Sequence, residues 1–93
     1  VRRGRIRAVH NIQRGAAEVI EAEALETSPL VGPPLSEVEF PDGMRIGAVY
    51  RDNEVQMPTG DMVINAGDRV VLMSMRENVK DVEQMFRVSI EYF

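Results

Sequence analysis

The sequence has 93 residues, the length of one small domain. With 44% hydrophobic and 28% charged residues, its composition is that of a folded chain and excludes an intrinsically disordered one. The absence of cysteine excludes disulfides and cysteine-based zinc sites, and no apolar run is long enough to span a bilayer. Because the chain starts at Val1 rather than at methionine, we expect a piece of a longer or processed protein.

The net charge of −4 is unevenly distributed along the chain. Residues 1–14 contain five arginines and no acidic residue, which leaves six basic and 15 acidic residues, or −9, for the rest. Such an acidic body would repel a phosphate backbone, so nucleic acid is not an expected partner. We interpret residues 1–14 as a basic N-terminal strand and connector whose arginines are solvated or paired with nearby glutamates.

Two strands are predicted in the first quarter of the chain. Residues 6–10 alternate apolar and polar side chains, as a half-buried strand does. Residues 17–25 alternate as well, with Ile20, Ala22 and Ala24 on one face and glutamates on the other. A helix competes for this second segment because it is rich in Ala and Glu, but two adjacent β-branched residues favour the strand.

The middle of the chain alternates between loops and strands. Residues 27–34 contain three prolines and a glycine, which is loop chemistry, and residues 35–38 read as one short helical turn. Residues 44–51 form the clearest strand of the sequence. Asp52 and Asn53, which tolerate positive φ, predict a hairpin that returns at residues 54–57.

The last third predicts a short extended piece, a corner, a strand and a helix. The short piece covers residues 62–64, and Gly67 supplies the left-handed backbone of the corner. Residues 69–75 are almost continuously apolar, which predicts a strand that is buried on both faces. Asn78 can cap the final helix, in which four apolar residues recur at helical spacing: Val79, Val82, Met85 and Phe86.

This order of elements predicts an α+β fold within one domain, residues 1–93. Its sheet should be small and mostly antiparallel, or a partial barrel, with one short helical turn and a C-terminal helix. The core should cover residues 15–86, and residues 87–93 should form a tail.

The residues offer little for catalysis. His10 is the single histidine, and no serine lies in a G-x-S-x-G context that would mark a nucleophile. Glu21 and Glu23 could support acid–base chemistry if buried, although a solvated sheet face is the simpler interpretation. Asp61 and Asp68 could ligate a hard cation, but turn carboxylates that accept backbone N–H bonds are the simpler interpretation. We therefore predict no enzymatic activity, no catalytic residue and no metal site.

Several short segments follow one another in an order typical of a known family. They are Gly15-x-Ala17-Glu18-Val19-Ile20-Glu21, Ser28-Pro29-Leu30-Val31-Gly32, Leu35-x-x-Val38, Met44-x-Ile46-Gly47-Ala48-Val49-x-Arg51, Pro58-x-Gly60-Asp61 and Ile64-x-x-Gly67-Asp68-Arg69-Val70-Val71. Over roughly residues 15–86 they resemble the C-terminal domain of the regulators of potassium conductance, the TrkA-C family. The opening Arg3-Gly4-Arg5-Ile6-Arg7-Ala8-Val9 and the ending Tyr92-Phe93 resemble the last domain of its duplicated proteobacterial members.

The resemblance implies a non-catalytic, ligand-sensing domain of a Trk-type potassium-uptake system. It implies a homodimer that is cytoplasmic and peripheral to the inner membrane, where the full-length protein contacts a potassium channel subunit. An NAD or ATP site would belong to a Rossmann domain, whose G-x-G-x-x-G motif this sequence lacks. No cofactor is therefore expected in this chain.

The resemblance also implies where a regulatory ligand binds. In some relatives cyclic di-AMP lies between two copies of the domain, at positions that point here to Val31, Gly32, Ser36, Arg45 and Pro58. Those relatives carry basic residues near the glycine and the helical turn, where this sequence has proline and serine, which argues against cyclic di-AMP. A small anionic or nucleotide ligand contacting Arg45 is the resulting hypothesis.

Two other interpretations stay open at the level of sequence. The domain could be a structural dimerisation module without a ligand. It could also be a small carboxylate-dependent enzyme that uses Glu21, Glu23 or Asp68.

Overall fold

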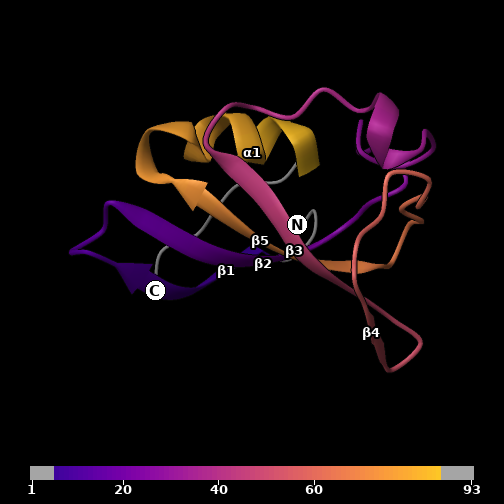
Figure 1. Ribbon diagram of the computed structural model, residues 1–93, viewed down its shortest axis with the longest axis horizontal. Coiled ribbons are helices and arrows are strands. Elements are labelled where there is room, and N and C mark those ends of the chain that lie inside the picture. The colour runs from indigo at the N-terminus through magenta and orange to yellow at the C-terminus, as the bar shows by residue number, and fades with distance from the viewer. Residues whose placement is uncertain (1–5, 87–93) are drawn as a thin grey trace.

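The computed structural model describes residues 6–86 (Figure 1). The strands are β1 (Ile6–Ile12), β2 (Ala17–Glu23), β3 (Met44–Arg51), β4 (Glu54–Gln56) and β5 (Arg69–Met75). A 3₁₀ turn, η1 (Leu35–Glu37), lies between β2 and β3, and a second one, η2 (Arg76–Asn78), leads into the helix α1 (Val79–Phe86). The predicted boundaries differ from these by at most a few residues.

The five strands form one open sheet in the order β1-β2-β5-β3-β4, and every neighbouring pair is antiparallel. The prediction of an α+β fold with an antiparallel sheet is confirmed. The predicted extended piece at residues 62–64 is not a strand of this sheet. It makes two isolated bridges instead, from Val63 to Pro34 and from Ile64 to Val31.

Strand β2 is a strand rather than a helix because it has a partner on each side. It pairs with β1 along one edge and with β5 along the other. As predicted, Ile20, Ala22 and Ala24 are buried, whereas Glu21 and Glu23 lie half-exposed on the opposite face. Glu18 shares the buried face, and its Oε1 has no hydrogen-bond partner, which nothing in the described part of the chain explains.

Helix α1 covers one face of the sheet (Figure 1). It buries Val79, Val82, Met85 and Phe86, which are the four residues whose spacing predicts its apolar side. Asn78 is the last residue of η2 and therefore directly precedes the helix, and its capping bond stays a prediction. Within residues 6–86, no helix is long and apolar enough to cross a membrane.

The prediction that β5 is buried on both faces is wrong for this chain. Val70, Leu72 and Ser74 are buried beneath α1, but Met73 and Met75 on the other face are 45% and 39% exposed. The reason is that α1 covers one face of the sheet only, whereas a continuously apolar strand is typical of a sheet covered on both faces.

Both turns that the sequence predicts from positive-φ residues are present. Asp52 and Asn53 have φ values of 52° and 65° and join β3 to β4. Gly67 has φ of 93°, and its N–H donates to the Ala24 carbonyl at 2.8 Å. A side chain at Gly67 would find open space but a strained backbone, so the corner before β5 depends on glycine.

Candidate functional site

A hollow of about 310 Å³ lies beside the first half of β3. Its lining is mostly apolar and includes one cation, two hydroxyls and a glycine: Leu35, Ser36, Phe40, Met44, Arg45, Ile46, Pro58, Thr59 and Gly60. A volume of this size is at the lower end of what small-ligand sites need.

The hollow exists because β4 is short. Within residues 6–86, β4 pairs only with Val49, Tyr50 and Arg51, so it leaves the edge of β3 from Met44 to Gly47 without a strand neighbour. Backbone groups on a free strand edge are available to another molecule. The hollow therefore combines an unpaired strand edge with the side chains that surround it.

The wall opposite β3 consists of η1 and residues 58–60, which are joined by backbone hydrogen bonds. The Leu35 N–H donates to the Met62 carbonyl at 2.9 Å, and the Ser36 N–H donates to the Gly60 carbonyl at 2.8 Å. A third bond, from Thr59 Oγ1 to Asp61 Oδ1, spans 2.7 Å and fixes the turn at this end of the segment. The two halves of this wall therefore hold each other in place.

Three of the five predicted site residues meet in this hollow. Ser36, Arg45 and Pro58 line it together, from η1, β3 and the segment after β4. Val31 and Gly32 do not line it. Val31 is half-buried and bridges to Ile64, whereas Gly32 is exposed, with φ of 123° and open space where a Cβ would lie.

The hollow could hold a ligand with one apolar part and one anionic part. Arg45 is exposed and supplies the charge, the Ser36 and Thr59 hydroxyls supply hydrogen bonds, and the remaining side chains are apolar. Sequence reasoning did not place the other six lining residues in the site, among them Phe40, Thr59 and Gly60. Thr59 and Gly60 lie in the segment Pro58-x-Gly60-Asp61, which is one of the segments that carry the resemblance. That segment is the feature of the sequence that could have placed them in the site.

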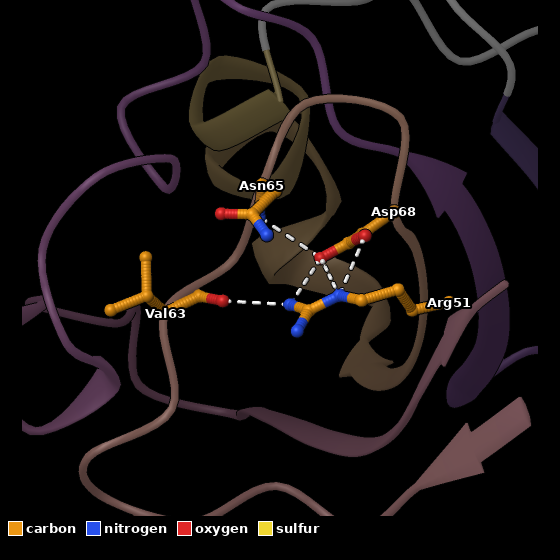
Figure 2. A network of polar contacts seen from close by, with 4 residues as sticks. All are labelled: Arg51, Val63, Asn65 and Asp68. Carbon is orange, nitrogen blue, oxygen red and sulfur yellow. Dashed lines mark hydrogen bonds and ion pairs between the residues drawn. The ribbon is translucent and has the colours of Figure 1, made fainter.

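A second polar arrangement, absent from the sequence-based site, lies at the other end of β3. Arg51 Nε donates to both carboxylate oxygens of Asp68 at 3.0 Å, and Arg51 Nη2 donates to Asp68 Oδ2 at 2.6 Å. The same Nη2 donates to the Val63 carbonyl at 2.8 Å, and the Asn65 N–H donates to Asp68 Oδ2 at 2.9 Å (Figure 2). Asp68 is only 4% exposed, so water has little access to its carboxylate and the protein groups supply its hydrogen bonds.

This network shifts the pKa of both charged groups. Burial alone would raise the pKa of the Asp68 carboxyl, but the hydrogen bonds from Arg51 and from the Asn65 amide outweigh it and lower that pKa. The hydrogen bond to Asp68 raises the pKa of Arg51 in turn, against the effect of desolvation. Both groups are therefore charged at neutral pH.

Several of the carboxylates and serines considered for chemistry have structural partners. Asp68 bonds Arg51 and the Asn65 amide as a turn carboxylate, and Glu21 pairs with Arg69 at 3.5 Å on the sheet surface. Ser28 Oγ donates to the Phe86 carbonyl at 3.1 Å. The side chains of His10 and Ser89 lie outside the described residues. In the described part of the chain, no group of three or more His, Cys, Asp or Glu residues could hold a metal ion.

Comparison with known proteins shows the family of this chain. The family model of the TrkA-C domain matches residues 19–87. A Trk system potassium uptake protein TrkA from Azorhizobium caulinodans is 60% identical over all 93 residues, and one from Halomonas elongata is 41% identical over 97 aligned residues that include the whole chain. A TrkA homologue from Methanosarcina mazei is 43% identical over 88% of the chain. The chain spans 20%, 21% and 18% of the length of these relatives. It belongs to the TrkA-C domain family.

Proposed function

We propose that this chain is a non-catalytic, ligand-sensing domain of a Trk-type potassium-uptake system. The observation that carries the proposal is a hollow with one arginine, Arg45, in a chain that belongs to the TrkA-C family. The relatives are named as potassium uptake proteins, which supports potassium transport as the process that the domain regulates. In the full-length protein the domain would lie on the cytoplasmic side of a membrane channel subunit.

The proposed ligand is a small anionic molecule or a nucleotide. Arg45 would donate a charge-assisted fork to its anionic group, and Phe40, Met44 and Ile46 would contact its apolar part. Ser36 and Thr59 would add hydrogen bonds from the facing wall. No cofactor is proposed for this chain.

The proposed assembly is a homodimer through the sheet face opposite α1. Met73 is 45% exposed there, and the register places it directly beside Arg45 on β3. Val55, 68% exposed on β4, pairs with Tyr50 on the same sheet. Burial of this face against a second copy would supply the cover that the apolar strand β5 otherwise lacks. The ligand hollow would then lie beside the interface.

Such a dimer gives the ligand a means of control. A ligand that binds one arrangement of two copies more tightly than another shifts the equilibrium between them. The coupling free energy in such systems is typically about 1–3 kcal/mol. A dimerisation module without a ligand is the competing function, because the exposed face alone would support it.

Arg45→Ala separates the two functions. We expect calorimetric titration of the chain with ATP, ADP and cyclic di-AMP to identify binding of at least one nucleotide. Arg45→Ala should weaken that binding at least tenfold, because the charge-assisted hydrogen bonds of the guanidinium are lost. The thermal midpoint should stay within about 1 °C, because Arg45 is exposed.

Two control variants complete the experiment. Lys80→Ala removes an exposed cation of α1, which lies away from the proposed dimer face and does not line the hollow, so the affinity should not change. Gly67→Ala strains the corner by about 1 kcal/mol and should lower the thermal midpoint with little effect on affinity. Unchanged nucleotide affinity in Arg45→Ala would exclude this hollow as the site, and no binding by the wild type would favour the module without a ligand.

A further inference from the structure

We infer that Arg51 is a positioning residue for the hollow, although it lies outside it. Its guanidinium ties the segment of residues 58–64 to the sheet and so fixes the wall that faces Arg45. This inference rests on the proposed function of the hollow as a ligand site. It concerns how the site is held in shape.

The first step is the position of Arg51 between two parts of the chain. Arg51 is the last residue of β3, and its side chain contacts the Asp68 carboxylate, directly before β5, at 2.6–3.0 Å. The same side chain reaches the Val63 carbonyl at 2.8 Å. Figure 2 shows the guanidinium between the carboxylate and this carbonyl, so one side chain joins the sheet to the segment.

The second step leads from Val63 to the hollow. Val63 bridges to Pro34 and Ile64 bridges to Val31, so the proline-rich loop runs along this segment. The adjacent carbonyls of Met62 and Gly60 accept the N–H groups of η1 that form the wall. A displacement of Val63 would therefore be transmitted to the Ser36 side of the hollow and to residues 58–60.

The third step is the requirement for arginine. The guanidinium is a planar fork whose separate nitrogens donate to the carboxylate, with Nη2 also donating to the carbonyl. A lysine has a single nitrogen on a flexible stem and does not reproduce this fork. Arg51→Lys therefore keeps the charge beside Asp68 and loses the geometry that holds Val63.

Hydrogen exchange of single amides tests the inference without any ligand. In Arg51→Lys we expect the amides of Leu35 and Ser36 to exchange about tenfold faster, because their acceptor carbonyls belong to the released segment. The amides of the β2–β5 ladder, such as Ile20 and Leu72, should keep wild-type rates and so report an intact sheet. The matched control Arg69→Lys, on the sheet surface, should change neither group.

Three outcomes would overturn the inference. Wild-type rates at Leu35 and Ser36 would show that the wall does not depend on Arg51. Equal acceleration at all amides would show that Arg51 only stabilises the fold. Acceleration of the two wall amides in Arg69→Lys would show that the effect is not specific to the clamp, the Arg51 side chain that joins Asp68 to the Val63 carbonyl.

A titration with ATP adds a second readout in the same variants. Arg51→Lys should weaken ATP binding roughly fivefold or more, although Arg51 does not line the hollow. Unchanged ATP affinity, together with faster hydrogen exchange of the Leu35 and Ser36 amides, would contradict the link between the clamp and the ligand site. If the wild type does not bind ATP, the proposal of a nucleotide ligand fails for ATP, and the exchange rates still decide the role of Arg51.

Discussion

Replacing Phe86 with alanine is expected to lower the free energy of unfolding by about 3–5 kcal/mol. Phe86 is the largest of the fully buried side chains, with 0% of its surface exposed, and it lies at the end of α1. Its removal would leave a cavity between the helix and the sheet. Because small domains are stabilised by only about 5–15 kcal/mol, this one side chain accounts for a large part of the total.

Urea denaturation followed by circular dichroism measures this effect. Gln84→Ala is the matched control, because Gln84 is an exposed residue of the same helix, and its free energy of unfolding should change by less than about 0.5 kcal/mol. A loss below about 1 kcal/mol in Phe86→Ala would contradict the packing of α1 against the sheet.

Asp68→Asn is the second change with a large expected effect. It should lower the free energy of unfolding by about 2–3 kcal/mol at pH 7. The amide keeps the shape of the side chain but loses the charge that faces Arg51. One of its two ends also becomes a donor, whereas Asp68 accepts bonds from Arg51 and from the Asn65 N–H. The guanidinium of Arg51 would then lose its counter-charge.

The effect of Asp68→Asn should depend on pH, with a sign that follows from the pKa shift. The folded pKa of Asp68 lies below its ordinary value of about 3.9. At pH values above that ordinary pKa, the ionised carboxylate therefore stabilises the fold fully. This stabilisation is lost as the pH falls towards the pKa that Asp68 has in the folded protein. The difference in the free energy of unfolding between wild type and Asp68→Asn should be constant from about pH 7 to about pH 5 and should shrink towards about pH 3.

Urea titrations at these three pH values test the prediction. Asp42→Asn, at an exposed aspartate in the turn before β3, controls for general effects of charge. A difference that stays constant down to about pH 3 would mean that the Asp68 carboxylate is not held by Arg51 as the structure describes.

Local patterns predict most of the elements because each depends on neighbours in sequence. The alternation of apolar and polar side chains predicts the two faces of β2, and the helical spacing of apolar residues predicts the buried side of α1. The strand order could not be predicted, because β5 inserts between β2 and β3 through pairing between distant residues. The exposure of Met73 also escaped prediction, because sequence does not say which apolar face a single chain leaves uncovered.

The candidate site was predicted only in part, for the same reason. The resemblance pointed to Ser36, Arg45 and Pro58, which line one hollow, and also to Val31 and Gly32, which do not. The Arg51–Asp68 pair joins residues that are 17 positions apart, and each of them reads locally as a strand end or a turn. Tertiary packing brings these two side chains together, so only the structure identifies the clamp.

Potassium uptake by cells tests the central claim most directly. Cells that lack their own Trk regulator would carry the full-length protein that contains this domain, either as wild type, as Arg45→Ala or as the control Lys80→Ala. We predict that Arg45→Ala changes the initial uptake rate about fivefold or more at equal protein levels, whereas Lys80→Ala matches the wild type. Equal uptake rates for all three proteins would contradict a regulatory site at the Arg45 hollow.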